Sequence, residues 1–304
     1  MQPNLKQAEK RKGFTIVELL TVMSIIVILI GLMVPALNRV RRFARDVQQK
    51  AQLKAMDAAV ELFRNEFDGY PPSGALDPMG QAYCGSMKLC EALMGQDLLG
   101  FHTNSVFRRD GLDAAGKLPL YPPNIDAMTP ALRESNLKAR KGPFLPAENV
   151  PTSRLQDIYG SNIGPYLGTS FVICDVYARD MRSGQKTGMP ILYFKADTAN
   201  SYHDPNFVQA MNRTDSHGNI FNYWDNQDLV LLGKPWQPSG GSAGTAAAHK
   251  MADPARFYRD TQSTQITTTM RPFRVDTFIL ISAGWDNEYG TADDIFNFEW
   301  KYRQ

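Results

Sequence analysis

FTIVELLTVMSIIVILIGLMVPAL, residues 14 to 37, is the stretch that decides the fold of this chain. Its 24 residues are enough to cross a bilayer, because about 20 apolar residues suffice for a membrane-spanning α-helix. Glu18 is the only charged residue in the run. An unpaired carboxylate at membrane depth costs about 3 kcal/mol, so Glu18 indicates a function beyond simple anchoring.

The segment before this run is polar and basic. Residues 1–13 read MQPNLKQAEKRKG, with four Lys or Arg residues against one Glu. A secretory signal peptide would have an apolar core of about 7 to 15 residues and then a small-x-small cleavage site. Here the apolar run is longer and continues through Pro35-Ala36-Leu37-Asn38 into a helical pattern. We therefore expect the apolar helix to stay in the mature protein.

Four features of this region coincide: a basic leader, a Gly13-Phe14 junction, Thr15 with Glu18 behind it, and an uninterrupted apolar helix. Together they resemble the class III signal of type IV pilins and type II secretion pseudopilins. The resemblance implies cleavage between Gly13 and Phe14 by a membrane prepilin peptidase, and N-methylation of the new Phe14 amine. It also implies that Glu18 attracts the Phe14 amine of a neighbouring subunit during assembly, and that Pro35 kinks the helix.

The resemblance places the chain in a bacterial inner membrane as a single-pass protein. Its N-terminus would be cytoplasmic and its C-terminal head periplasmic, with a periplasmic fibre after assembly. Charge alone gives no orientation, because basic residues also follow the span, at Arg39, Arg41, Arg42 and Arg45.

Residues 38–67 continue the helix as an amphipathic segment. Apolar residues recur there in steps of three and four, a helical period, at Val40, Ala44, Val47, Ala51, Ala55, Ala59 and Leu62. A helix from Phe14 to about Phe67 would be roughly 80 Å long at 1.5 Å per residue. We expect the alanine-rich stripe to pack against a sheet; a free coiled coil is the alternative. Asp68-Gly69 and the following Tyr70-Pro71-Pro72 end the helix.

Residues 68–304 are expected to form a globular head. A short amphipathic helix is predicted over 86–99, and residues 119–151 read as a proline-rich connection. Strand patterns follow at 170–178, 190–197 and 276–284, with RSGQKTG as a hairpin turn between the first two. The sequence therefore predicts an α+β, pilin-like fold, in which a long N-terminal helix packs on an antiparallel β-sheet head.

The stretch SAGWDNEYGTADDIFNF, residues 282–298, crowds carboxylates into a glycine-containing loop after a strand. Close carboxylates repel unless a cation neutralises them, and Ca²⁺ selects hard oxygen ligands. The loop resembles the calcium loop of major pseudopilins. The resemblance implies a structural Ca²⁺ held by Asp286, Asp293 and Asp294, with Ser282 as a weaker ligand. A solvated acidic turn is the alternative.

Nothing in the sequence indicates an enzyme. The four histidines are scattered, Asp215-Ser216-His217 is not a nucleophile elbow, and Gly184-Gln185-Lys186-Thr187 lacks the upstream glycine of a phosphate loop. The net charge of +2 gives no reason to expect nucleic acid as a partner. Cys84 and Cys90 could form a disulfide in an oxidising compartment or remain thiols.

The resemblance favours a structural pseudopilin of a type II secretion system. Its expected partners are copies of itself, other pseudopilins, the prepilin peptidase and the inner-membrane secretion platform. A type IV pilin for adhesion, motility or DNA uptake is the second hypothesis. Many such pilins close a C-terminal loop with a disulfide, whereas no cysteine follows Cys174 here. A third hypothesis is a membrane-anchored binding module, because residues 75–272 make the head large for a major pseudopilin.

Overall fold

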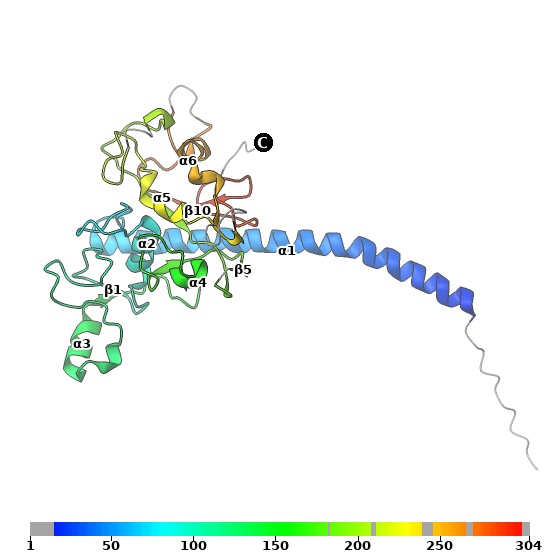
Figure 1. Cartoon of the computed structure of the whole chain (residues 1–304), viewed down its shortest axis with the longest axis horizontal. Coiled ribbons are helices and arrows are strands. Elements are labelled where there is room, and N and C mark those ends of the chain that lie inside the picture. Colours follow the sequence, from blue (N-terminus) through cyan, green and yellow to red (C-terminus); the bar gives the residue numbers. More distant parts are fainter. Residues whose placement is uncertain (1–14, 182, 208–210, 239–245, 266–269, 300–304) are drawn as a thin grey trace, which may run out of the picture. The chain divides into compact units, whose positions relative to one another are not determined.

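The computed structural model describes residues 15–181, 183–207, 211–238, 246–265 and 270–299. The chain divides into two compact units, Met1–Ala44 and Arg45–Gln304. The first helix, α1 (Ile16–Phe67), is continuous through the boundary between them. The architecture is α+β, as predicted: one long N-terminal helix and a head of short helices and small antiparallel sheets (Figure 1).

The first unit consists of the N-terminal part of α1. This helix is long and apolar enough to cross a membrane, and the side chains of its apolar part are exposed throughout. Pro35 lies inside α1. Because proline has no N–H, the carbonyl of Gly31, four residues earlier, loses its helical hydrogen bond at this point. The predicted helix therefore forms across the proline, with one backbone bond missing.

The head contains the remaining elements, all shorter than α1. Its helices are α2 (Gly85–Met94), α3 (Pro130–Lys138), α4 (Leu155–Tyr159), α5 (Trp224–Val230) and α6 (Pro254–Thr261), with 3-10 turns at Ile125–Ala127, Pro205–Phe207 and Lys250–Ala252. Its strands are β1 (Phe101–His102), β2 (Arg140–Lys141), β3 (Thr152–Arg154), β4 (Phe171–Ile173), β5 (Arg179–Asp180), β6 (Lys186–Thr187), β7 (Leu192–Lys195), β8 (Lys234–Pro238), β9 (Ala246–Ala247), β10 (Phe278–Ser282) and β11 (Ile295–Phe296).

The central sheet of the head has the strand order β11-β10-β7, and both pairings are antiparallel. Leu280 of β10 lies opposite Tyr193 of β7, and Ile281 lies opposite Phe296 of β11. All five residues of β10 are buried, so this strand forms the middle of the core. The strand pattern at 276–284 was therefore a correct guide to the centre of the sheet.

The predicted strand pairing between 170–178 and 190–197 is only partly formed. β4 pairs with β3, and it meets the β7 segment only through the Cys174–Pro190 bridge and the bond from the Ile191 amide to the Ile173 carbonyl. β7 pairs instead with β10, which comes about 80 residues later in the chain. A small antiparallel hairpin of β5 and β6 does form here, but β6 (Lys186–Thr187) lies within the stretch that was predicted to be the turn.

The face that α1 turns toward the head differs from the predicted stripe. The buried residues of its C-terminal half are Gln49, Gln52, Leu53, Met56, Ala59, Val60 and Phe63. Only Ala59 is shared with the predicted stripe; Val47 and Leu62 are 50% and 54% exposed, and Ala51 and Ala55 are exposed as well. The prediction that the alanine stripe packs on the sheet is therefore wrong. Apart from Ala59, that stripe is exposed.

Two buried glutamines of α1 form hydrogen bonds to the head. Gln52 donates from Nε2 to the Cys174 carbonyl at 2.7 Å, and the Val176 amide donates to Gln49 Oε1 at 2.9 Å. Both side chains are buried and bond to the backbone just beyond β4. Buried amides are tolerated when they are hydrogen-bonded. The face of α1 that attaches to the head therefore combines these two amides with larger apolar side chains, among them Leu53, Met56 and Phe63.

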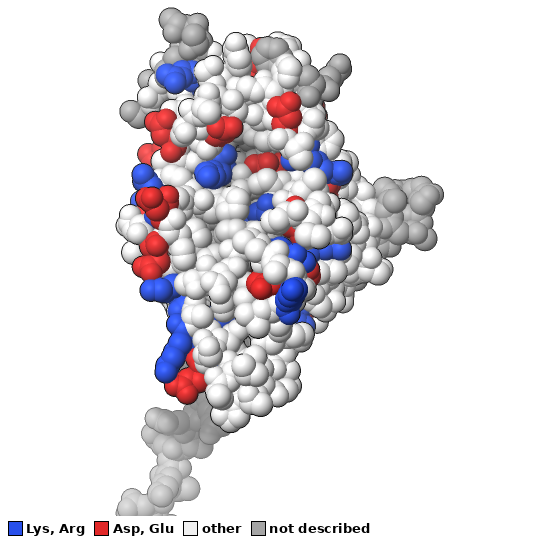
Figure 2. Space-filling view, turned by 90° about the vertical axis from the view of Figure 1, so that its left-hand side faces the viewer, with Lys and Arg blue, Asp and Glu red and all other residues white. Residues whose placement is uncertain are grey.

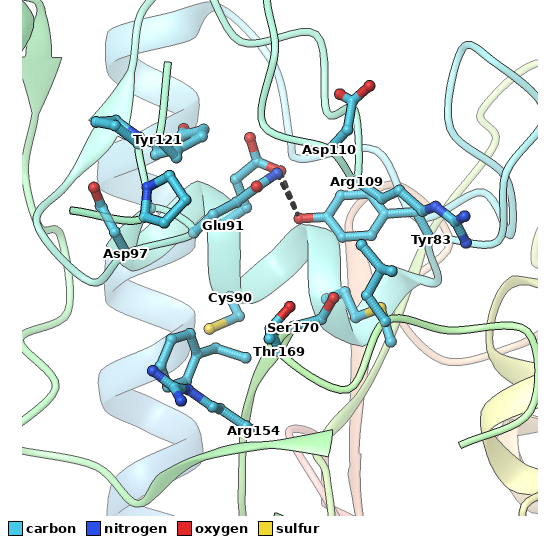
Figure 3. A pocket seen from close by; sticks show the side chains of 17 residues that line it. Tyr83, Cys90, Glu91, Asp97, Arg109, Asp110, Tyr121, Arg154, Thr169 and Ser170 are labelled. Atoms are coloured by element: carbon cyan, nitrogen blue, oxygen red, sulfur yellow. Dashed lines mark hydrogen bonds between the residues drawn. The ribbon is translucent and has the colours of Figure 1, made fainter. Parts of the chain in front are cut away.

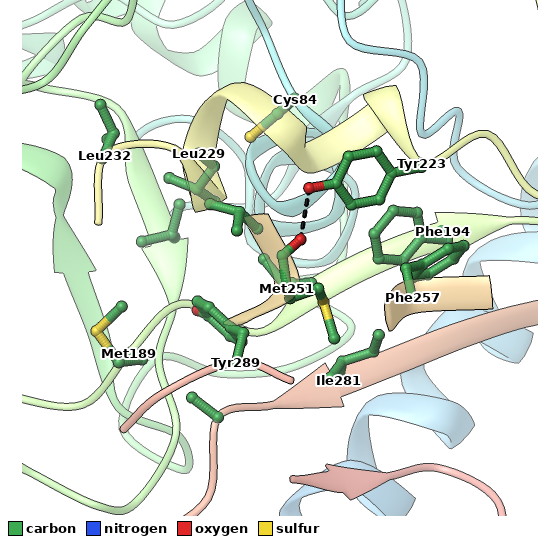
Figure 4. Packing of buried hydrophobic residues seen from close by; sticks show 14 of the residues in the cluster. Cys84, Met189, Phe194, Tyr223, Leu229, Leu232, Met251, Phe257, Ile281 and Tyr289 are labelled. Atoms are coloured by element: carbon green, nitrogen blue, oxygen red, sulfur yellow. Dashed lines mark hydrogen bonds between the residues drawn. The ribbon is translucent and has the colours of Figure 1, made fainter. Parts of the chain in front are cut away.

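The interior of the head has two hydrophobic clusters. One contains the C-terminal half of α1, most of α2 and residues of β7 and β10. The other contains residues of α4, α5 and α6. In this cluster the ring centroids of Phe194 and Phe257 lie 4.5 Å apart, and the Tyr223 hydroxyl donates to the Met251 carbonyl at 2.6 Å (Figure 4). Cys84 belongs to this cluster and Cys90 to the other, and both are buried thiols.

A buried carboxyl in α5, that of Asp225, makes stability depend on pH. Asp225 accepts a hydrogen bond from Ser73, and burial raises its pKa to about 7, although Ser73 and the Lys88 charge act in the opposite direction. The unfolded pKa is about 3.9, so the folded protein keeps this proton over a range where the unfolded chain has lost it. Stability from this group is therefore full below pH 4 and is lost as the pH rises through 7.

We expect Asp225 by itself to lower the free energy of unfolding by about 3 kcal/mol between pH 5 and pH 8. Asp175, whose pKa is also raised to about 7 by burial, acts in the same direction, whereas His203 and His249, whose pKa values burial lowers to about 4 and about 3, act in the opposite direction below about pH 6.5. Asp225→Asn should therefore remove the Asp225 contribution, measured as the difference between the melting temperatures of the wild type and the variant across this range. A variant with the full wild-type slope would contradict this assignment.

Candidate functional site

The described start of α1 is built around Glu18. The Thr15 amide donates to Glu18 Oε2 at 2.9 Å and the Thr15 hydroxyl donates to the same oxygen at 2.7 Å. In return, the Glu18 amide donates to Thr15 Oγ1 at 3.2 Å. This reciprocal arrangement is a capping box, which satisfies backbone N–H groups that the first turn of a helix leaves without partners.

Glu18 therefore has a local partner within one chain. Its acidic side chain lies in the first turn of α1, where the positive end of the helix dipole favours a negative charge. The Thr-x-x-Glu spacing of Thr15 and Glu18 is the sequence signal for this cap. Gly13 and Phe14, the predicted cleavage and methylation residues, lie outside the described residues.

The acidic loop after β10 brings two of the predicted ligands together. The Asp286 amide donates to Asp293 Oδ2 at 3.0 Å, and the Thr291 hydroxyl donates to Asp293 Oδ1 at 2.7 Å. Burial and the nearby Asp293 charge raise the pKa of Asp286. Burial alone would also raise the pKa of Asp293, but bonds from Thr291 and the Asp286 amide lower it. The two carboxylates thus share one small site, and Asp293 is the stronger anion.

The other two predicted ligands have different partners. Asp294 Oδ2 accepts from the Gly290 amide at 2.7 Å, so this buried side chain shapes the turn. The Ser282 hydroxyl donates to Asp175 Oδ2 at 3.2 Å and accepts from the Gly284 amide. The structure therefore brings Asp286 and Asp293 together but gives Ser282 and Asp294 roles in holding the loop.

Asp175 is a residue of this region that sequence analysis missed. It is completely buried and accepts hydrogen bonds from Ser282 and from the Tyr177 and Met189 amides. These bonds join the end of β4 to the start of the acidic loop. The sequence offers no signal for this, because Asp175 simply follows the apolar residues FVIC and is separated from the loop by more than a hundred residues.

The donor set of the acidic loop fits a hard cation in part. Two adjacent carboxylates are the ligand type that Ca²⁺ prefers, and the cation needs six to eight oxygens in total. Among the residues that the structure describes, no three His, Cys, Asp or Glu side chains converge as a metal-binding group. A cation bound by Asp286 and Asp293 would therefore depend on backbone or water oxygens for the rest of its shell.

A second feature is the exposed side of α1 in the head. We call Val47, Ala51, Ala55 and Leu62 the alanine stripe; all four are exposed and recur at helical spacing. Small side chains let two helices approach closely, as they do in helix pairs within membranes. The stripe is thus an apolar helix face that the head itself does not cover.

A cavity of about 440 Å³ lies beside α2, between its C-terminal end and residues 167–171 (Figure 3). Glu91 projects into this region and accepts hydrogen bonds from Tyr83, Gln96 and Ser105. Arg109 donates to the Pro165 carbonyl at 3.0 Å. Because these polar groups are bonded within the head and Glu91 is only 1% exposed, the cavity gives no indication of a ligand.

Comparison with known proteins gives a match for the N-terminal part of the chain. Residues 9–34 match the family model for the prokaryotic N-terminal methylation motif. The chain carries a pilin-type N-terminal signal. No curated protein sequence and no solved structure matches the chain. The matched residues include Gly13, Phe14 and Glu18, so the signal identified from the residues is confirmed as a motif, and it implies processing by a prepilin peptidase.

Proposed function

We propose that this protein is a structural pseudopilin subunit of a type II secretion system. The observation that carries the proposal is α1 itself: a methylation motif, a span-length apolar helix and an exposed alanine stripe follow one another on a single helix. After processing at Phe14, subunits would assemble through this helix into a periplasmic fibre that helps to move folded proteins across the outer membrane.

Glu18 gives the assembly its register. In one chain its carboxylate caps the helix with Thr15, a bond to neutral groups that leaves the negative charge in place. In a fibre surrounded by apolar helices, the ammonium group of a neighbouring Phe14 would neutralise that charge. A buried charge without a counter-charge is strongly destabilising, so only the stagger that joins the two groups is favourable.

A type IV pilin used for adhesion, motility or DNA uptake is the second candidate. The lack of any cysteine after Cys174 and the acidic loop at residues 282–298 favour the secretion branch. A membrane-anchored binding module is the third, and the large head is the reason for considering it. These alternatives share the signal and the span, and differ in what the head and the fibre do.

A deletion strain distinguishes the branches. Loss of proteins from the culture medium, with their accumulation in the periplasm, is the result expected for a secretion subunit. Loss of motility, adhesion or DNA uptake with normal secretion would instead identify a type IV pilin. Complementation with the Glu18→Ala variant separates fibre formation from anchoring, because an anchored binding module should still function with that change.

We further propose that the acidic loop binds Ca²⁺ through Asp286 and Asp293. Calcium would remove the repulsion between the two carboxylates and stabilise the folded head by mass action. We expect Ca²⁺ at about 100 times its Kd to stabilise the head by about 3 kcal/mol, a rise in melting temperature of several degrees that a chelator reverses.

Asp293→Asn should abolish this calcium response, because the change removes the stronger anion of the pair. Asp197→Asn is the matched control, since Asp197 is an exposed aspartate in a different loop. The measurement is thermal melting with Ca²⁺ and with chelator for the wild type and both variants. Equal melting temperatures of the wild-type protein under the two conditions would count against the site.

A further inference from the structure

The acidic loop is the tip of a β-hairpin that contacts α1 at two places. β10 pairs with β11, so residues 283–294 form the tip of this hairpin. The Asn297 amide donates to the Leu280 carbonyl at 3.3 Å, which places Asn297 at the base. The two contacts with α1 are at Arg45 and Asp57, about 12 residues apart, or roughly 18 Å at 1.5 Å per residue. All of these residues belong to the second unit.

Asp57 of α1 binds the base of the hairpin. Asp57 Oδ1 accepts from Asn297 Nδ2 at 2.8 Å, and Asp57 Oδ2 accepts from Arg274 Nη2 at 2.8 Å. The same guanidinium nitrogen donates to the Asn297 carbonyl at 2.9 Å, and Asn297 Oδ1 accepts from the Leu280 amide at 3.0 Å. Hydrogen bonds to charged groups are stronger than those between neutral groups. The base is therefore attached to α1 by a closed set of bonds.

Arg45 and Asp46 of α1 bind the tip of the hairpin. The Arg45 guanidinium lies 5.2 Å from the centroid of the Trp285 ring, a cation–π contact. The Trp285 ring also meets the Tyr177 ring edge-on at 6.2 Å. The Tyr177 hydroxyl donates to Asp46 Oδ1 at 2.6 Å, and Asn287 Nδ2 donates to the Tyr177 carbonyl at 2.8 Å. The tip is thus attached to α1 directly and through Tyr177.

Hydrogen bonds inside the hairpin connect its tip to its base. The Asp286 amide donates to Asp293 Oδ2 at 3.0 Å, and the Gly290 amide donates to Asp294 Oδ2 at 2.7 Å. β11 follows directly and is a two-residue strand at the edge of the sheet, whereas β10 lies in the middle of the core. Proteins open locally in contiguous cooperative units, and short edge segments with few core contacts open first.

We propose that residues 283–298 open and close as one unit, so that the contacts at Arg45 and at Asp57 form and break together. The acidic loop is then a conformational element that couples two places on α1. Whatever orders the tip also strengthens the attachment at Asp57, and this coupling is reciprocal. A cation held by Asp286 and Asp293, as proposed above, would act on Asp57 without touching it. The coupling itself needs neither a cation nor a role in secretion.

The test is native-state hydrogen exchange of the full chain in detergent micelles, read by mass spectrometry with a chelator present. Peptides over residues 284–292 report on the tip, and peptides over 294–299 report on the base. Asp57→Asn removes the charge at the base and keeps the size of the side chain. We expect exchange to become about tenfold faster, by the same factor in both sets of peptides, because hydrogen bonds to charged groups contribute most.

A second variant perturbs the hairpin from its other end. Arg45→Gln removes the cation above Trp285 at an exposed position of α1, so the head should fold normally. We expect about threefold faster exchange, again by the same factor at the tip and at the base. The matched control is Glu66→Gln, because Glu66 is another acid of α1 and pairs with Lys141 of β2 at 2.7 Å. Both sets of peptides should exchange in this control as in the wild type.

The outcomes that would overturn the inference are distinct. On the face of the molecule shown in Figure 2, acidic and basic side chains are interspersed, so no single substitution removes a dominant charged patch there. Faster exchange at the base alone in Asp57→Asn would show that the two contacts break independently. Equal acceleration throughout the head, β7 and α6 included, would show a general loss of stability instead of coupling. Fast exchange of both sets in the wild type would show that the hairpin does not close without a cation, which overturns this inference and leaves the proposed calcium site and secretion role standing.

Discussion

Replacing Glu18 with alanine should abolish fibre formation while the head still folds. The change removes the only carboxylate of the apolar run, so the Phe14 ammonium group of a neighbouring subunit would enter the fibre without a counter-charge. We expect the amount of sheared or pelleted fibre to fall by about tenfold or more. The measurement is fibre yield by electron microscopy and sedimentation, in a host that has the prepilin peptidase and its assembly machinery.

Two controls make this result specific. N-terminal sequencing must show that the Glu18→Ala chain still begins at Phe14, which excludes a processing defect. Thr15→Val removes the capping hydroxyl but keeps the Glu18 charge, so it should weaken the cap by about 1 kcal/mol and leave most fibres intact. If Glu18→Ala and Thr15→Val were equally harmful, the cap rather than the charge pair would explain why an acid stands at position 18.

The second large effect should come from the alanine stripe. Ala51→Arg with Ala55→Arg places two long cations on an exposed helix face, where the folded monomer can accommodate them. In a fibre in which helices pack along this stripe, the same side chains would be buried without partners. We expect fibre yield to fall by about tenfold or more, because an unpaired buried charge costs several kcal/mol.

The monomer provides the control for this variant. Its melting temperature should stay within about 2 °C of the wild type, since surface changes rarely alter stability by more than about 0.5 kcal/mol. Thr198→Arg adds a cation at an exposed position of the head and should assemble normally. Normal fibres from A51R/A55R would show that the stripe is not the assembly face.

The sequence was a good guide to α1 and to the centre of the head. The apolar run and its continuation predict a single helix, and the helix extends from Ile16 to Phe67. β10 was found correctly because a short apolar run with two isoleucines, followed by a glycine, is consistent with a fully buried strand. Helix α2 forms at the predicted place but ends at Met94, because Gly95 follows with a φ of 82°.

What the sequence could not show depends on contacts between distant residues. The side of α1 that meets the head includes Gln49 and Gln52, whose amides bond to backbone groups more than a hundred residues away. Leu53, Met56, Val60 and Phe63 on that side also have helical spacing, so this segment carries two competing apolar series and periodicity alone does not choose between them. The pairing of β7 with β10 is hidden for the same reason, since local strand patterns do not specify partners far along the chain.

The residues of the candidate sites also fall into two groups: those that local sequence patterns reveal and those that depend on contacts between distant residues. Glu18 and the methylation motif are local patterns, so they were found from the residues and the motif was confirmed. In the acidic loop, the proximity of Asp286 and Asp293 follows from their closeness in sequence. The hydrogen bond from Ser282 to Asp175 does not follow from closeness in sequence, because it depends on how the end of β4 is placed beside the loop.

The attachment of the head to α1 also has a mechanical consequence. The hydrogen bonds from the Val176 amide to Gln49 and from Gln52 to the Cys174 carbonyl are followed, farther along α1, by the buried side chains of Met56 and Phe63. A pull along the helix axis would load these contacts all at once, in shear, rather than opening them one after another. The head should therefore resist being pulled from α1 along the helix axis.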